Sequence, residues 1–127
     1  MKITILNGSP RPGGNTEIMA DAFRKGAAEA GHEVTQINLA GKKIAGCLGC
    51  HHCFANNGEC VQKDDMEGIL QVIDQTDLLV FASPVYWFDI TSQMKSVIDR
   101  MYARGKIGFH FAKTALQQVY TLGKNVR

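Results

Sequence analysis

The stretch that decides the fold is ITILNGSPRPGGNTE, residues 3–17, where a short apolar run gives way to a loop and then to a helix. Lys2–Leu6 is rich in isoleucine, which predicts a buried strand, and Gly8-Ser9-Pro10 ends it with a turn. From Thr16 onward, apolar residues recur at helical spacing, among them Met19, Ala22 and Phe23, which we expect on the buried face, and Gly31 stands where a C-terminal cap belongs. We therefore expect this loop to join a strand to the N-terminus of a helix, with Asn15 or Thr16 as its cap.

The rest of the chain repeats this alternation of strand and helix. The expected elements are a strand at Val34–Leu39, a helix after Asp64 or Asp65, a strand within Asp77–Ser83, and a helix from Thr91 or Ser92. The first strand of this group has the polar content of an edge strand, and the second is apolar on both faces, as a central parallel strand requires. Such alternation predicts an α/β fold, a three-layer sandwich with a parallel sheet between helices. Thr114–Leu122 fits a fourth strand and a helix equally well.

Composition narrows the class of protein. The 127 residues predict a single domain, and a hydrophobic fraction of 45% with 20% charged residues excludes a disordered chain. The net charge of +2 without a basic block predicts neither a nucleic-acid nor a membrane partner. No secretion signal is visible at the N-terminus, so we expect a cytoplasmic protein. In that compartment the cysteines favour metal or redox chemistry over disulfides.

The loop NGSPRPGGNT, Asn7–Thr16, has the chemistry of a phosphate cradle. Backbone N–H groups and the helix dipole favour an anion at a helix N-terminus, and Ser9, Arg11, Asn15 and Thr16 add side-chain donors. The loop is neither a Walker loop nor a G-x-G-x-x-G motif. The alternative is an ordinary turn built from glycine and proline.

A second loop, SPVYWFDIT, follows the third strand at residues 83–91. In open α/β sheets, ligands bind outside the carboxyl ends of the strands. Pro84 stiffens this backbone, and Tyr86, Trp87 and Phe88 supply flat apolar surface for a planar ring. The alternative is an aromatic cluster buried against a helix or another subunit. A phosphate loop and an aromatic loop together imply a mononucleotide.

The cysteines form a third constellation, CLGCHHCFANNGEC, and they are Cys47, Cys50, Cys53 and Cys60. A C-x2-C-x2-C run with a further cysteine is typical of ferredoxin-type clusters, so a 4Fe-4S cluster is one interpretation. A zinc site and four free thiols are the others. His51 and His52 lie between the cysteines, and in a polar loop we expect them to be exposed.

Taken together, GSPRPGGNT, the cysteine loop, VQKDDM and SPVYWFDITSQMKSVIDRMY resemble the flavodoxin-like NAD(P)H-dependent FMN reductases. The cysteine loop is most similar to the iron–sulfur flavoprotein branch, and the resemblance covers Met1 to about Tyr102. It implies that the FMN phosphate contacts Ser9, Arg11, Asn15 and Thr16. It also implies that the isoalloxazine ring lies against Pro84, Val85, Tyr86, Trp87 and Phe88, near a subunit interface.

The chain departs from this family after about residue 105, where the last strand, helix and flavin loop of the family have no counterpart. We therefore expect a single flavodoxin-like domain over residues 1–127 that is shortened at its C-terminal end. A sheet edge left open predicts a homodimer or higher oligomer. The resemblance implies an FMN-dependent oxidoreductase that passes electrons from NAD(P)H to a small-molecule or protein acceptor. The alternatives are a flavin and iron–sulfur electron carrier, or a shortened chain that no longer binds FMN.

Overall fold

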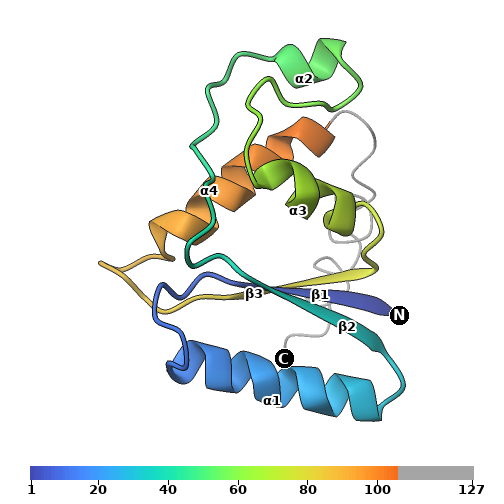
Figure 1. Ribbon diagram of the computed structural model, residues 1–127, viewed down its shortest axis with the longest axis vertical. Coiled ribbons are helices and arrows are strands. Elements are labelled where there is room, and N and C mark those ends of the chain that lie inside the picture. Colours follow the sequence, from blue (N-terminus) through green and yellow to red (C-terminus); the bar gives the residue numbers. More distant parts are fainter. Residues whose placement is uncertain (106–127) are drawn as a thin grey trace, which may run out of the picture.

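The computed structural model describes residues 1–105 and confirms the expected order of elements (Figure 1). The elements are β1 (Lys2–Asn7), α1 (Asn15–Glu29), β2 (Glu33–Asn38), α2 (His52–Ala55), α3 (Met66–Ile73), β3 (Leu78–Ala82), α4 (Ser92–Arg100) and a final 3-10 turn, η1 (Met101–Arg104). The short helix α2, inside the cysteine loop, was not predicted. The expectation for Thr114–Leu122 falls outside the described residues.

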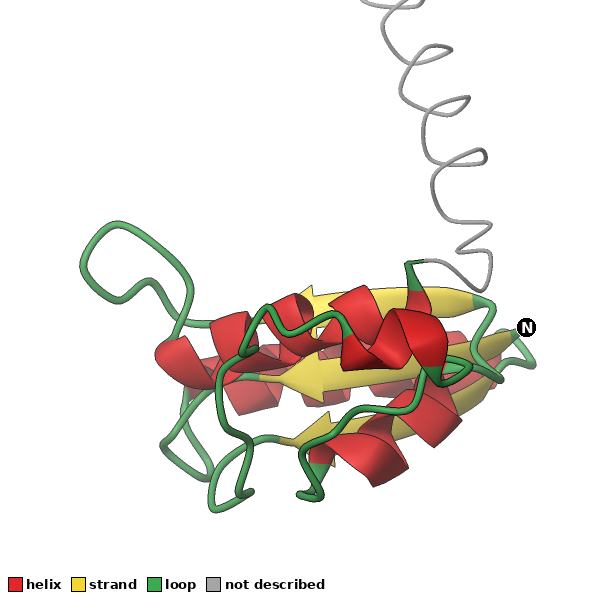
Figure 2. Cartoon of the chain, turned by 90° about the horizontal axis from the view of Figure 1, so that it is seen from above, coloured by secondary structure: helices red, strands yellow, loops and turns green. Residues whose placement is uncertain are grey.

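The strands form one parallel sheet in the order β2-β1-β3. Helix α1 covers one face of this sheet, and α3 and α4 cover the other, so the predicted α/β sandwich of three layers is confirmed (Figure 1, Figure 2). In register, Leu6 of the central strand lies between Ile37 and Phe81. The carboxyl ends of β1 and β3 are therefore neighbours, and the two loops singled out in the sequence start side by side.

The main core lies between the sheet and the helices α3 and α4. Leu6 and Leu79 contribute from the sheet, and the buried side chains of the two helices recur every three or four residues, as the predicted stripes require. Each such side chain contributes roughly 1.5–3 kcal/mol when fully buried. This core therefore holds α4, and with it the end of the loop after β3, against the sheet.

Strand β3 corrects one expectation. It was expected at the centre of the sheet, but within residues 1–105 it is an edge strand, and Leu78 and Phe81 are 40% and 45% exposed. Its apolar residues on both faces suit a strand with neighbours on both sides. The described sheet therefore ends on an apolar edge.

Helix α1 corrects a second expectation, which concerns its buried face. Met19 and Phe23 were expected on its buried stripe, yet Met19 is 72% exposed, and Ala20 is the buried residue of the helix. The physical reason is the width of the sheet formed by residues 1–105, because its three strands cover only part of the apolar arc of the helix. Among residues 1–105, no helix has the length and apolar character needed to cross a bilayer.

Candidate functional site

The loops after β1 and after β3 are tied together at their bases. Gly8 N–H donates to the carbonyl of Ala82 at 2.8 Å, and the buried hydroxyl of Thr91 donates to the carbonyl of Gly8 at 2.7 Å. The same hydroxyl accepts from Met94 N–H and so caps α4, as the sequence predicted. A Cβ at Gly8 would lie 2.9 Å from the Cβ of Met94 and from the Thr91 oxygen, so only glycine lets the segments approach this closely. The two loops are thus fixed relative to each other.

The loop after β1 leaves the N-terminus of α1 open. The N-cap is Gly14 rather than Asn15 or Thr16, and no side chain of residues 1–105 caps the helix. The carboxylate of Glu17 accepts a hydrogen bond from Gly13 N–H at 2.5 Å, so the loop already holds one negatively charged group of the protein. Gly13 has a φ of +70°, a conformation that glycine adopts without strain. An uncapped helix N-terminus with this geometry is suited to an anion.

The four residues expected at the phosphate divide into two kinds. Arg11 and Asn15 are exposed and Thr16 is half-buried, and within residues 1–105 their side chains make no hydrogen bond or ion pair. Ser9 is buried, and its hydroxyl accepts from Arg11 N–H at 3.2 Å and donates to the Arg11 carbonyl at 3.3 Å. The structure therefore leaves three of these side chains available to a ligand and shows that Ser9 shapes the loop.

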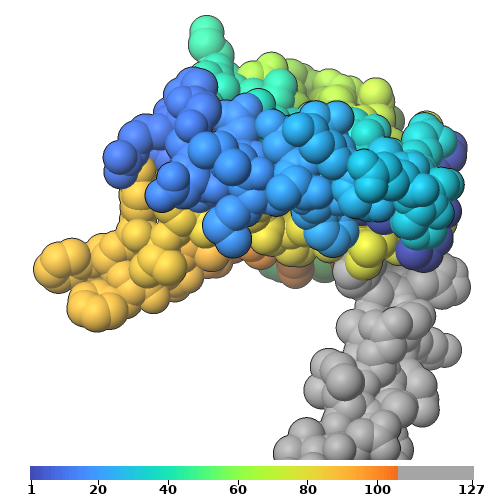
Figure 3. Space-filling view, turned by 90° about the horizontal axis from the view of Figure 1, so that it is seen from below, coloured from blue at the N-terminus to red at the C-terminus, as the bar shows by residue number. Residues whose placement is uncertain are grey.

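The loop after β3 ends in a tight hairpin tip. Tyr86 and Asp89 exchange two backbone hydrogen bonds, and between them Trp87 and Phe88 have φ angles of +44° and +69°. Both aromatic side chains are 91% exposed, and the loop projects from the body of the molecule (Figure 2, Figure 3). In the described part of the chain these two rings contact each other edge to face, and no helix of residues 1–105 buries them.

The structure also shows the other two residues that were expected to lie against the isoalloxazine ring. Pro84 is half-buried at the base of the loop, and Val85 is exposed. The hydroxyl of Ser83 donates to the Pro84 carbonyl and accepts from Thr91 N–H, which fixes the base against α4. The loop therefore combines a rigid base at Ser83 and Pro84 with an exposed aromatic arm, formed by Tyr86, Trp87 and Phe88.

The cysteine loop connects β2 to α3. Its four cysteines are unpaired thiols, two exposed and two half-buried, and all four line one small pocket together with Arg100 and Tyr102. In residues 1–105, no three histidine, cysteine or acidic side chains are grouped so that they could hold a metal ion. The zinc alternative is therefore not formed by the described residues, and the geometry does not support the expected cluster. His51 and His52 are exposed, as expected, and His51 Nδ1 lies 3.4 Å from the Tyr102 hydroxyl.

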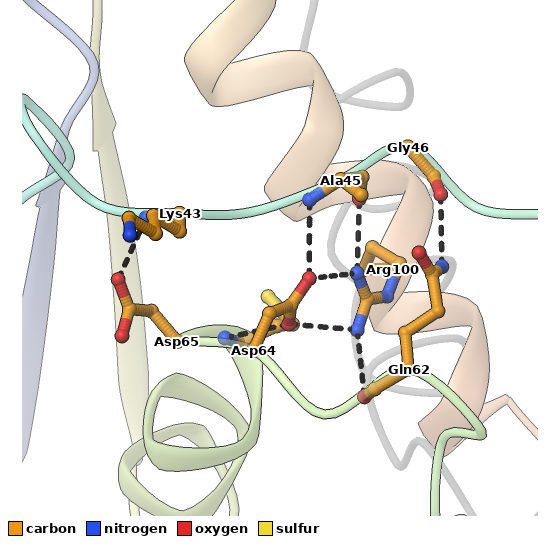
Figure 4. Close-up of polar contacts among 8 residues, drawn as sticks. Lys43, Ala45, Gly46, Gln62, Asp64, Asp65 and Arg100 are labelled. Atoms are coloured by element: carbon orange, nitrogen blue, oxygen red, sulfur yellow. Dashed lines mark hydrogen bonds and ion pairs between the residues drawn. The ribbon is translucent and has the colours of Figure 1, made fainter.

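Arg100, which the sequence analysis did not single out, closes the base of this loop (Figure 4). It comes from α4, is 2% exposed, and forms a bidentate ion pair with Asp64 at 2.7 and 3.0 Å. Its terminal nitrogens also donate to the carbonyls of Ala45 and Gln62, one on each side of the cysteines. The signal in the sequence was an arginine at the spacing of the apolar stripe of α4, after Met94 and Val97.

Asp64 does more than the helix capping expected of it. Its carboxylate accepts from Met66 N–H in the first turn of α3, but also from Ala45 N–H and from Arg100. Burial by itself would raise the pKa of the Asp64 carboxyl, but the hydrogen bonds from Arg100 and from these two N–H groups outweigh it, so the pKa is lowered. Asp65 occupies the N-cap position of α3, but its carboxylate makes no capping hydrogen bond and instead accepts from Lys43 N–H.

Two observations test whether these residues suit the groups that the sequence implied. The N-terminus of α1, which no side chain of residues 1–105 caps and beside which the Arg11 and Asn15 side chains have no hydrogen-bond partner in those residues, suits the phosphate of FMN. In the cysteine pocket, the Nε of Arg100 is buried and has no hydrogen-bond partner among the described residues. Although four thiols line this pocket, no three of the cysteine, histidine or acidic side chains in residues 1–105 are grouped so that they could hold a metal ion, so the pocket as described does not fit the cluster.

Comparison with known proteins supports the resemblance to the FMN reductases. The model of one protein family, NADPH-dependent FMN reductase, matches residues 1–125. An iron–sulfur flavoprotein from Archaeoglobus fulgidus is 44% identical over 105 residues, which are 83% of this chain and 47% of that protein. An iron–sulfur flavoprotein from Methanocaldococcus jannaschii is 37% identical over 100 residues, which are 79% of this chain and 51% of that protein. The chain thus spans about half the length of these curated relatives.

Solved structures match the fold. An NAD(P)H:quinone oxidoreductase from Methanothermobacter marburgensis superimposes with a TM-score of 0.65 at 24% identity, over 80% of this chain and 53% of that one. An azoreductase from Bacillus anthracis gives a TM-score of 0.62 at 18% identity, over 80% of this chain and 55% of that one. At these identities the likeness concerns the fold alone, which is flavodoxin-like as expected.

Proposed function

The chain belongs to the NADPH-dependent FMN reductase family, and on that premise we propose that it binds FMN and passes electrons from NAD(P)H to an acceptor. One observation carries the proposal. The open N-terminus of α1 and the aromatic arm after β3 stand at the carboxyl ends of adjacent parallel strands and are joined through Thr91 and Gly8. An anion site and an apolar surface at that edge of an α/β sheet suit a mononucleotide.

In this proposal the loop after β1 binds the phosphate of FMN, and the loop after β3 contacts its ring. Arg11, Asn15 and Thr16 hold the phosphate, since their side chains are free and near the positive end of α1. The residues Pro84–Phe88 flank the ring and shield one side of it from water. Bound FMN supplies the redox chemistry, which explains why no acid–base pair of side chains stands out at this edge. The electron acceptor, a small molecule or a protein, is left open by these residues.

The experiment is a fluorescence titration of the protein with FMN. The wild type should bind, and Arg11→Ala should weaken binding by about 1.5–3 kcal/mol, the usual worth of a hydrogen bond to a charged group. Arg24→Ala is the matched control, because Arg24 lies on α1 but pairs with Asp21 at the surface. Equal affinity in wild type and Arg11→Ala refutes the role of Arg11. A wild type that does not bind FMN favours the alternative of a shortened chain without cofactor.

A second candidate function is an electron carrier that joins FMN to an iron–sulfur cluster at Cys47, Cys50, Cys53 and Cys60. The observation that favours it is the pocket shared by all four thiols, with the buried Arg100 beside them. The test is iron and acid-labile sulfide after anaerobic reconstitution, with Cys50→Ser as control. Substoichiometric iron, or iron unchanged by Cys50→Ser, leaves free thiols and the plain FMN reductase. Aerobic turnover with NADPH separates an enzyme from a carrier.

A further inference from the structure

We propose that Glu17 is a positioning residue of the phosphate site, whose carboxylate ties the loop after β1 to the end of β2 through Asn38. The inference rests on the proposed binding of FMN, and it assigns a role to one residue of α1 and one of β2 that the proposal leaves unused. A carboxylate beside a phosphate is unfavourable by its charge, because like charges repel. Its place in this loop therefore needs a reason in the geometry.

The two oxygens of Glu17 accept hydrogen bonds from two different segments. Oε2 accepts from Gly13 N–H at 2.5 Å, and Oε1 accepts from Asn38 Nδ2 at 3.2 Å. Glu17 lies in the first turn of α1, and Asn38 is the last residue of β2. The carboxylate thus joins the turn at Gly13, where φ is +70°, to the carboxyl end of the sheet.

The amide of Asn38 continues this connection to the start of the loop. Its Oδ1 accepts from Asn7 Nδ2 at 3.2 Å, across a pair of residues that are partners in the parallel register. The buried Asn7 in turn accepts from Ser9 N–H at 3.0 Å with its own Oδ1. One chain of hydrogen bonds therefore runs from Ser9 to Gly13 and fixes both relative to the sheet.

The direction of these hydrogen bonds requires a carboxylate at position 17. The Oδ1 of Asn38 also accepts from Gln36 Nε2 at 3.2 Å, so the amide cannot turn over without setting its N–H groups against other donors. Its Nδ2 must face Glu17, and Gly13 N–H faces Glu17 as well. The side chain between these two donors needs two acceptors, which glutamate has and glutamine lacks.

A loop fixed in this way suits the binding of a phosphate. The first N–H groups of α1 have no partner within the helix, and the side chain of Arg11 is free within residues 1–105. Because the loop is already ordered, binding does not have to pay for ordering it. We therefore expect the shape that Glu17 maintains to matter more for FMN affinity than the repulsion between its charge and the phosphate.

The experiment is a fluorescence titration with FMN of Glu17→Gln, of Asn38→Asp and of the double variant that carries both. Glu17→Gln sets two N–H donors against each other and Asn38→Asp sets two carboxylates against each other, so each should bind FMN about tenfold more weakly than the wild type. In the double variant every donor again meets an acceptor, because the new glutamine accepts from Gly13 N–H and donates to the new aspartate. Its affinity should return to within about twofold of the wild type.

The controls separate the phosphate site from the rest of the protein. Asp21→Asn is the matched variant, since Asp21 is another carboxylate of α1 but pairs with Arg24 at the surface, and it should keep the wild-type affinity. Riboflavin, which has the same ring and no phosphate, should bind no more weakly to Glu17→Gln than to the wild type. An equal loss for both flavins overturns a role at the phosphate.

A second measurement needs no ligand. In the FMN-free protein labelled with ¹⁵N, the amide proton of Gly13 should resonate downfield in the wild type and in the double variant, and should move upfield in Glu17→Gln. A resonance that does not move overturns the bridge itself. FMN binding by Glu17→Gln that equals or exceeds that of the wild type, or a double variant no better than the single ones, overturns the positioning role alone. A wild type that does not bind FMN overturns the proposed function, and the Gly13 resonance then still decides whether the bridge exists.

Discussion

Replacing Asp64 by asparagine should destabilise the protein strongly. The carboxylate neutralises Arg100, which is 2% exposed, through two hydrogen bonds of 2.7 and 3.0 Å. Asparagine keeps the shape but removes the charge, so the guanidinium stays buried without a counter-ion. Breaking a buried pair in this way costs about 3–5 kcal/mol. For a chain of this length, such a loss lowers the midpoint of thermal unfolding by roughly 10–20 °C.

The assay is urea unfolding followed by circular dichroism, with Asp65→Asn as the matched control. Asp65 is the next residue and is exposed, and its carboxylate accepts one hydrogen bond, from Lys43 N–H, so its replacement should cost about 1 kcal/mol or less. Adding Arg100→Met to Asp64→Asn removes the stranded charge, and the double variant should lose less than the sum of the single losses. If Asp64→Asn costs no more than Asp65→Asn, the ion pair does not hold the cysteine loop to α4 and the reasoning fails.

Three further predictions follow from the described residues. Replacing Trp87 by asparagine and Phe88 by glycine, the pair that a turn with two positive φ angles prefers, should raise the free energy of unfolding by about 1–2 kcal/mol and weaken FMN binding; unchanged FMN affinity would contradict a role of the arm at the ring. Because the pKa of the Asp64 carboxyl is lowered in the folded state, the ionised carboxylate stabilises the fold above the ordinary aspartate range, and this stabilisation is lost as the pH falls below about 4. The free energy of unfolding of Asp64→Asn should therefore depend less on pH in that range than that of the wild type. The same pH dependence in both proteins would count against the ion pair. The exposed apolar edge at β3 and α1 should make the protein a homodimer or higher oligomer at micromolar concentration, which light scattering would contradict by showing a stable monomer.

Local patterns in the sequence were sufficient to predict the helices and strands and their order. The strands, the helices α1, α3 and α4, the edge position of β2 and the cap at Thr91 depend on spacing within a few residues, which the sequence displays directly. The two loops at the carboxyl ends of β1 and β3 were located for the same reason, because a break between a strand and a helix is a local signal. The roles of Ser9, Arg11 and the aromatic arm in FMN binding stay predictions, as does the cytoplasmic location.

Only the tertiary structure decided which of these elements are neighbours and which side chains are buried. The apolar stripe of α1 predicted a buried Met19, but burial depends on how much sheet lies beneath a helix, and the described sheet stops at β3. The bidentate pair of Asp64 and Arg100 joins residues 36 positions apart, and no local pattern encodes such a contact. The sequence by itself determined the chemistry that each loop offers. The fold determined that Thr91 joins the first two loops and that Arg100 closes the third, because those contacts exist only once β1, β3 and α4 are packed together.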